Sequence, residues 1–224
     1  MKLVHPSFFL PIEFEENISQ TLIIENPKDF SELIYELRKQ INGEDGKWVL
    51  SQNGEPINIT KKCEMIIDLF SVDLNERKLL TALYSMLEKE IQTTELLLEW
   101  NTVYPFLVNK MDKLISSADY MLSYKNDIEI KDFFKIMNLQ FLSDTTDFFE
   151  KLLDYLRLAH EVLNVELFIF VNIKGFLNES QLHFLKEQSM YQKFQILLIE
   201  SYDNEMRTSA EKVTIIDKDS CVIQ

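Results

Sequence analysis

Two almost wholly apolar segments, separated by a helical pattern, constrain the fold of this chain most strongly. The segments are residues 165–171 (VELFIFV) and 194–200 (FQILLIE), and residues 178–191 between them have helical spacing. Strands that are apolar on both faces are buried on both faces, which is typical of parallel sheets. Parallel strands need a crossover connection, and a helix of this length supplies one. The C-terminal part of the chain is therefore predicted to contain a parallel β-α-β unit.

The N-terminal part shows a second set of strand signals around one helix. Pro27 opens this helix, which continues to about Ile41, because a proline in the first helical turn forfeits no hydrogen bond. A Gln-Asn-Gly turn at residues 52–54 indicates a hairpin. The strand signals fall at 12–16, 21–25, 47–51, 57–59 and 64–70, with two short C-terminal strands at 213–217 and 221–223. We expect the strands from both ends of the chain to form one mixed sheet domain.

Residues 74–164 have an almost entirely helical pattern. Two apolar stripes at helical spacing are Leu79, Leu80, Leu83, Leu87 and Ile91, and Phe148, Leu152, Tyr155, Ala159 and Val162. Ser143 or Asp144 is the expected N-cap of the second helix. The predicted fold class is therefore α/β, with a mixed sheet domain built from residues 1–73 and 165–224. An α-helical subdomain, residues 74–164, is inserted into it.

Glycine is scarce, and this scarcity bears on nucleotide chemistry. The chain has only four glycines, at positions 43, 46, 54 and 175. A phosphate-binding loop needs glycines whose backbone N–H groups converge, followed by a lysine and a serine or threonine. No such sequence is present, and the apolar strand ends in Asn172 where a carboxylate would hold magnesium. We therefore expect no nucleotide cofactor and no nucleotide hydrolysis.

Other catalytic sites are equally weakly indicated. No G-x-S-x-G sequence is present, His160 and His183 lie in helical patterns, and two distant cysteines make no zinc site. A metal-dependent nuclease stays open as an alternative, although no D-x-n-[DE]-x-K arrangement stands out among the 37 acidic residues. The longest apolar run, residues 167–171, is far shorter than the ~20 residues of a membrane span. We expect a cytoplasmic protein with no membrane partner, and no enzyme.

The formal net charge of −14 argues at first against a nucleic-acid partner, because binding to polyphosphate needs positive surface. The charge is unevenly distributed, however. Residues 1–60 carry a net charge of −5 and residues 141–211 carry −6, whereas residues 105–140 are neutral. The candidate phosphate-binding lysines are Lys110, Lys113, Lys125, Lys131 and Lys135 in or near this neutral part, and the pair Lys61 and Lys62. Taken alone, each pair is more often a solvated surface than a binding site.

An ordered set of motifs resembles the Csn-two family, the short type II-A CRISPR-associated proteins of spacer acquisition. The motifs are DLFSVDLN at 68–75, DFFK at 132–135, FEK at 149–151, LFIFVN at 167–172, FLNE at 176–179, ILLIE at 196–200 and IIDKD at 215–219. No single motif is specific, whereas their order and spacing together are. The resemblance covers essentially the whole chain.

This resemblance implies a degenerate P-loop ATPase head that has lost its nucleotide site, within a non-enzymatic homotetrameric ring. Rings of this kind take up double-stranded DNA, preferably through free ends, into a hole lined by lysines, without reading sequence. They act in antiviral defense together with the CRISPR adaptation integrase and the type II effector nuclease. Lys135 matches a lysine of the family pattern, whereas the other candidate lysines depend on local charge alone. The alternative is an acidic oligomeric scaffold that docks other adaptation proteins without touching DNA.

Calcium is a further implication of the resemblance, because calcium ions stabilise the ring in this family. Family members carry a dense acidic run before the helix of the matched lysine. The corresponding stretch here has only Asp119 and Asp127, followed by Glu129. Calcium takes six to eight oxygen ligands, so these three residues would need carbonyls, water or other segments to complete a site. A calcium-independent variant of the family is the alternative.

Overall fold

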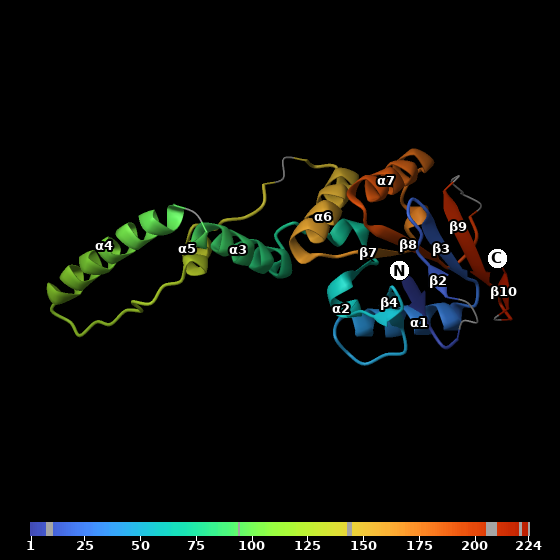
Figure 1. The fold of residues 1–224 in the computed structure, drawn as a ribbon, viewed down its shortest axis with the longest axis horizontal. Helices are drawn as coiled ribbons and strands as arrows, with labels where there is room; N and C mark the ends of the chain where they lie inside the picture. The colour runs from blue at the N-terminus through green and yellow to red at the C-terminus, as the bar shows by residue number, and fades with distance from the viewer. Residues whose placement is uncertain (8–10, 94, 143–144, 205–209, 220, 224) are drawn as a thin grey trace. The chain divides into compact units, whose positions relative to one another are not determined.

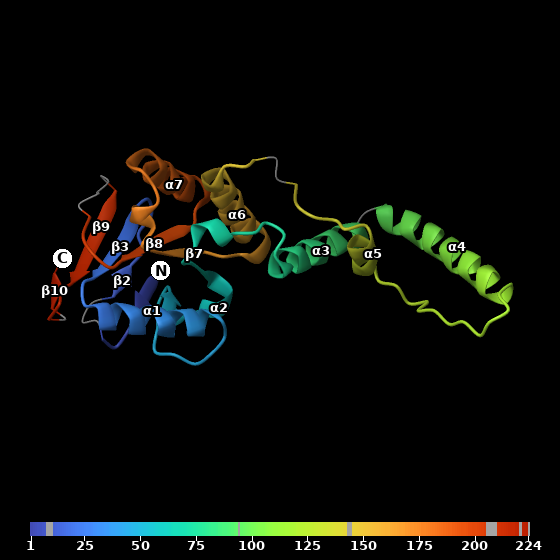
Figure 2. The same cartoon turned by 180° about the vertical axis from the view of Figure 1, so that it is seen from behind.

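The computed structural model describes residues 1–7, 11–93, 95–142, 145–204, 210–219 and 221–223. The chain divides into two compact units, shown from opposite sides in Figures 1 and 2. The sheet unit comprises Met1–Leu74 and Ser143–Gln224, and the helical unit comprises Asn75–Leu142. No helix in the described ranges is long and apolar enough to cross a membrane.

The main sheet of the sheet unit has six strands in the order β10-β9-β3-β8-β7-β6. These strands are β3 (Ser19–Ile24), β6 (Cys63–Ile66), β7 (Leu167–Val171), β8 (Gln195–Glu200), β9 (Glu211–Ile216) and β10 (Val222–Ile223). Neighbours from β6 to β9 pair in parallel, and β10 pairs antiparallel with β9. Helix α7 (Glu179–Gln192) connects the parallel strands β7 and β8. The predicted α/β class, the mixed sheet and the β-α-β unit are confirmed.

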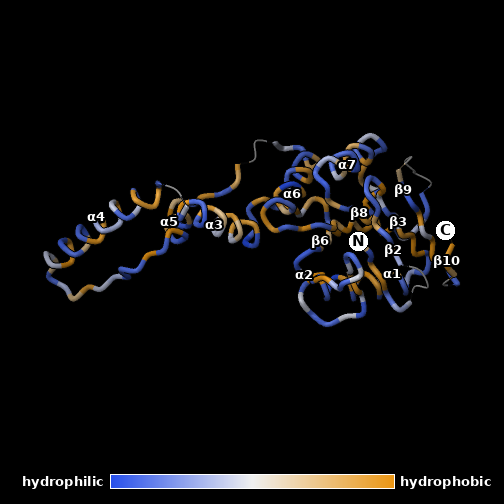
Figure 3. The backbone as a smooth tube through the Cα atoms, viewed as in Figure 1, coloured by the Kyte–Doolittle hydropathy of each residue, from blue (hydrophilic) through white to orange (hydrophobic). Residues whose placement is uncertain are grey.

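Helices cover both faces of this sheet, which explains why its central strands are apolar throughout. On one face, Leu22, Leu197 and Ile199 share a core with α1 (Pro27–Ile41) and α2 (Ile59–Lys62). Helices α6 (Phe148–Leu163) and α7 cover the other face (Figure 1). There Phe168 is fully buried, and its ring centroid lies 4.8 Å from that of Phe194. The hydrophobic colouring of the strands in Figure 3 follows from this double burial.

The remaining N-terminal strands form a separate small antiparallel sheet. Its order is β2-β1-β4-β5, with β1 (Lys2–Val4), β2 (Ile12–Glu13), β4 (Val49–Gln52) and β5 (Glu55–Pro56). The predicted hairpin is present, and Asn53 and Gly54 both have positive φ, as tight two-residue hairpin turns require. The strand expected at 57–59 is absent: residues 57 and 58 lie in neither a helix nor a strand, and Ile59 begins α2. The helix begins here because the Asn58 side chain accepts the backbone N–H of Lys61 as an N-cap.

Two further element ends differ from the sequence prediction for the same reason. The strand expected at 64–70 ends at Ile66, because the Asp68 carboxylate accepts the backbone N–H of Phe70 at 2.9 Å and starts the short helix η1 (Leu69–Ser71). The N-cap of α6 is Asp147, which accepts the N–H of Phe149 at 2.8 Å. The expected caps, Ser143 and Asp144, lie outside the described residues.

Helix α6 belongs to the sheet unit, whereas the sequence placed it in the helical insertion. Its buried stripe of Leu152, Tyr155, Leu156 and Ala159 packs in the layer that also contains α7. The helical unit is therefore shorter than expected. It contains α3 (Arg77–Gln92), α4 (Leu96–Ser116) and α5 (Ile130–Ile136).

Candidate nucleic-acid interface

Aromatic contacts fix the position of α5, which carries the lysine matched to the family pattern. The Tyr84 hydroxyl of α3 donates to the carbonyl oxygen of Leu139 at 2.6 Å, and its ring lies 5.7 Å from that of Phe134. The ring of Trp100 in α4 lies 5.4 Å from that of Phe133. These contacts join all three helices of the unit, so the lysines of α5 are presented from a packed element.

Lys135 and Lys125 converge on one carboxylate. The Nζ of Lys135 lies 3.0 Å from Oδ1 of Asp132, and the Nζ of Lys125 lies 3.6 Å from Oδ2 of the same residue. The hydrogen bond from Lys135 lowers the pKa of Asp132. Both lysine side chains are more than 60% exposed. Exposed ion pairs of this kind contribute little to stability because water screens them, so an incoming anion can replace Asp132 at either lysine.

Lys131 has a different environment, although it lies only one turn from Lys135. Its Nζ lies 2.6 Å from Oε2 of Glu88 in α3, and 32% of its side chain is exposed. The hydrogen bond that Lys131 donates to this carboxylate raises the pKa of Lys131. Lys131 therefore ties α5 to α3, and the structure gives it a packing role within the helical unit.

Lys110 and Lys113 lie on the last two turns of α4, next to the segment 117–129. The Nζ of Lys110 lies 5.0 Å from the ring centroid of Phe106. The following segment is held against α4 by the hydroxyl of Tyr124, which donates to Asp112 at 2.6 Å. This hydrogen bond raises the pKa of Tyr124 to about 12. Lys110 and Lys113 are thus exposed on α4, and the segment that follows this helix is attached to it through Tyr124.

The remaining candidate lysines, Lys61 and Lys62, belong to α2 in the sheet unit. Lys62 forms an ion pair with Glu166, at the entry to β7. Within the described part of the chain, Lys61, Lys110 and Lys113 form no ion pair with a carboxylate. The seven candidate lysines are therefore divided between the two units, and four of them are ion-paired.

The three candidate calcium ligands are not brought together. Among the described residues, no group of three or more histidines, cysteines or acidic residues is arranged to hold a metal ion. Asp119, Asp127 and Glu129 all lie in the described part of the helical unit. Within one chain these residues therefore do not fit the oxygen-rich coordination that calcium requires.

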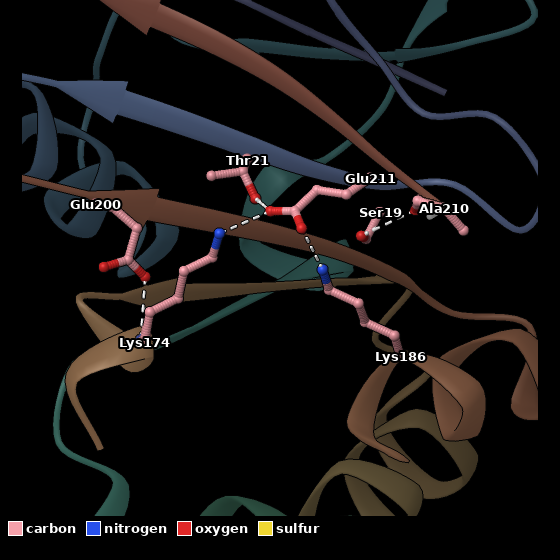
Figure 4. A network of polar contacts seen from close by, with 7 residues as sticks. All are labelled: Ser19, Thr21, Lys174, Lys186, Glu200, Ala210 and Glu211. Atoms are coloured by element: carbon pink, nitrogen blue, oxygen red, sulfur yellow. Dashed lines mark hydrogen bonds and ion pairs between the residues drawn. The ribbon is translucent and has the colours of Figure 1, made fainter. Parts of the chain in front are cut away.

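A buried charged network in the sheet unit was missed by sequence reasoning (Figure 4). Both carboxylate oxygens of Glu211, at the start of β9, accept hydrogen bonds from lysines. Lys174 reaches Oε1 and Lys186 reaches Oε2, each at 2.8 Å. The Thr21 hydroxyl of β3 also donates to Glu211. All three charged side chains are at most 3% exposed.

The carboxylates of this network have opposite pKa shifts. Burial alone would raise the pKa of Glu211, but the hydrogen bonds from Lys174 and Lys186 hold it at about 2. Glu200, at the end of β8, accepts the backbone N–H of Lys174 at 3.2 Å. Burial raises the pKa of Glu200 to about 7. The sequence carries no signal of this network, because its members are spread from β3 to β9 and each looks like an ordinary surface residue.

Comparison with known proteins places this chain among the CRISPR-associated proteins. The model of the Cas_Csn2 family of CRISPR-associated proteins matches residues 40–220, which is most of the chain, and the chain therefore belongs to this family. Membership implies a role in CRISPR adaptation and confirms the family that the motifs indicate. No curated protein matches the chain.

Among solved structures, the chain is similar to a metal-chelate type ABC transporter in an inward-facing conformation. The sequence identity is 10% and the TM-score is 0.45. The alignment covers 96% of this chain and 74% of the transporter chain.

Proposed function

We propose that this protein is a non-enzymatic binder of double-stranded DNA in CRISPR spacer acquisition. It assembles as a homotetrameric ring with a hole lined by lysines. Linear DNA enters this hole through its free end. It serves there beside the adaptation integrase and the type II effector nuclease. Family membership supplies the pathway, and one observation supports the DNA contact: Asp132 holds two exposed lysines, Lys125 and Lys135, at one position.

A DNA phosphate is a suitable replacement for Asp132. It is an anion with several oxygens, and it can accept hydrogen bonds from both lysines at once. Lysine acts as a point charge and reads no base edge, so such contacts position the duplex without selecting a sequence. We assign the main DNA contact to Lys125 and Lys135, with Lys110 and Lys113 as further contacts. Lys131, Lys61 and Lys62 are secondary candidates.

The exposed apolar surface of α4 supports assembly from several copies. None of the 21 residues of α4, all of which lie in the described part of the chain, is buried. Four exposed residues lie on one face at spacings of seven, four and seven: Leu96, Val103, Leu107 and Leu114. A contiguous exposed apolar stripe marks an interaction site.

The stripe is also symmetric about Pro105, which lies inside the helix. If a second α4 packs antiparallel with its own Pro105 opposite, Leu96 meets Leu114 and Val103 meets Leu107. A two-fold interface requires this kind of self-complementary pattern. We therefore infer that one contact between copies is formed by α4 against α4.

The sheet unit is, in this proposal, a degenerate P-loop ATPase head without a nucleotide site. Strand β3 leads almost directly into α1, and the Asn26 side chain occupies the N-terminus of that helix by accepting the N–H of Lys28 at 3.0 Å. At the end of β7, the Asn172 side chain accepts the N–H of Ser201 at 2.9 Å. At both positions where such a head would hold phosphate and magnesium, an asparagine side chain instead makes a hydrogen bond to the backbone of this chain.

The proposal is tested by binding of linear duplex DNA to the wild type and to the Lys125→Glu/Lys135→Glu variant at low salt. We expect the variant to bind at least tenfold more weakly while keeping its assembly in light scattering, recorded with and without calcium. The control is Lys28→Glu, which reverses an even more exposed lysine of the sheet unit. Unchanged binding by the double variant would overturn the assignment of these lysines.

The same protein samples also distinguish the proposed function from two rival functions. The ion pairing of Lys62, Lys125, Lys131 and Lys135 favours an acidic scaffold without DNA contact. A scaffold would give no shift of linear duplex even at low salt. A metal-dependent nuclease would cut the duplex during incubation with magnesium or manganese.

A further inference from the structure

Three phenylalanines form a cluster at the carboxyl edge of the main sheet. Phe70 follows β6, Phe176 follows β7, and Phe148 is the first residue of α6. The ring centroid of Phe70 lies 5.2 Å from that of Phe148 and 5.7 Å from that of Phe176, and the latter pair meets edge to face. The three rings come from sequence positions up to 106 residues apart, and the pairing of β6 with β7 brings two of them together.

Two of these rings are held outward, toward solvent. Phe70 is 62% exposed and Phe176 is 50% exposed, whereas their neighbours Leu69 and Leu177 are each 3% exposed. The alternation is fixed locally, because Asp68 caps η1 and so sets the direction in which Leu69 and Phe70 point. Each segment therefore uses its leucine for the core and presents its phenylalanine on the surface. Exposed aromatic groups of this kind mark interaction sites more often than isolated exposed residues do.

The sequence around the three rings is acidic. Five carboxylates lie within three residues of one of the phenylalanines: Asp68, Asp73, Asp147, Glu150 and Glu179. The same windows contain two lysines. One of them, Lys174, is buried against Glu211, which leaves the half-buried Lys151. This cluster is therefore aromatic with an acidic surround, which repels a phosphate backbone.

We propose that Phe70, Phe148 and Phe176 form a docking surface for a basic amphipathic segment of another protein. Apolar side chains of that segment pack on the two exposed rings, while its lysines or arginines pair with the surrounding carboxylates. A cation above a phenylalanine face adds a further attraction. The segments DLFSVDLN and FLNE contribute two of the three rings, and neither segment is used by the proposed DNA contact. The docking surface is thus independent of DNA binding and would let the protein hold a partner and DNA together.

The test uses the full-length protein and a defined probe. The probe is a fluorescent helical peptide built of leucine and lysine, and a peptide with glutamate in place of lysine is its charge-reversed partner. We expect the basic peptide to bind at least tenfold more tightly than the acidic one. The Phe70→Ser/Phe176→Ser variant should lose at least tenfold in affinity for the basic peptide, whereas Phe70→Tyr/Phe176→Tyr retains it. The control Tyr191→Ser, which removes an aromatic ring that is 84% exposed on α7, should bind as the wild type does.

A second variant keeps the test valid if the serine variant unfolds. Glu150→Lys/Glu179→Lys leaves every ring in place and should weaken binding of the basic peptide severalfold. Equal affinity for both peptides, or unchanged binding by the serine and lysine variants, would overturn the proposal. Loss of assembly in the serine variant would show that a second copy covers the rings, and loss of duplex binding would assign them to DNA. Both outcomes would contradict a protein-docking surface.

Discussion

The Nζ of Lys174 lies 2.8 Å from Oε1 of Glu211, and the two side chains are 1% and 0% exposed. Lys174 follows β7, and Glu211 begins β9 on the far side of β3 and β8. Lys186 adds a second bond to the same carboxylate from α7. This relationship joins separated strands of the sheet to the helix layer through one buried charge, so it is expected to govern the stability of the sheet unit.

Replacement of Glu211 by glutamine should destabilise the protein strongly. It removes the negative charge that faces two buried lysines, and breaking a buried ion pair in this way costs roughly 3–5 kcal/mol. Chemical denaturation followed by circular dichroism measures the effect. The control is Glu13→Gln, which removes the exposed partner of Lys2. A Glu211→Gln variant as stable as the control would contradict the role assigned to the network.

Stability should fall as the pH rises from about 4.5 to 7, because of Glu200. Its pKa is about 7 in the folded protein and near 4.5 when unfolded, so the folded state binds the extra proton in this window. Stability falls with pH wherever the folded state binds more protons than the unfolded state. Glu200→Gln should remove this contribution, on the order of 1–3 kcal/mol. Thermal unfolding of the wild type and of Glu200→Gln at pH 5 and pH 8 measures this contribution. An identical pH dependence of stability in the two proteins would contradict the role assigned to Glu200.

The assembly should depend on the exposed stripe of α4. Leu107→Glu places a charge in the middle of the symmetric stripe, where it would face the apolar Val103 of the other copy. We expect light scattering to show a smaller assembly for this variant. Leu98→Glu is the matched control, because Leu98 is an exposed leucine of the same helix on a different face. Equal masses for the two variants would remove α4 from the interface.

The salt dependence of DNA binding should report the lysines that contact phosphates. Each neutralised phosphate contributes about −0.9 to the slope of log K against log salt for duplex DNA. Lys125→Gln and Lys135→Gln should each make the slope shallower, while Lys131→Gln leaves it nearer that of the wild type because Lys131 is engaged by Glu88. A slope changed as much by Lys131→Gln as by Lys135→Gln would contradict this order.

The parallel part of the fold could be predicted because burial on both faces leaves an unmistakable apolar run, as in β7 and β8. The small sheet could not, since strands of two or three residues such as β2 and β5 are too short to show a period. The division into units was misjudged at α6, whose apolar stripe looks the same whether it faces a sheet or another helix. In the candidate site, the four-residue spacing of Lys131 and Lys135 predicts one helix face for both, and only the structure shows that Lys131 is tied to Glu88 while Lys135 lies beside Asp132.

The most direct test of threading through a ring is to compare linear duplex DNA with a covalently closed circle of the same sequence. Both carry the same phosphates, so contact from outside would bind them equally, whereas entry by a free end is possible only for the linear form. The proposed ring predicts that linear DNA binds and that the closed circle fails to bind until it is cut once. Equal affinity for the closed and the linear form would contradict it.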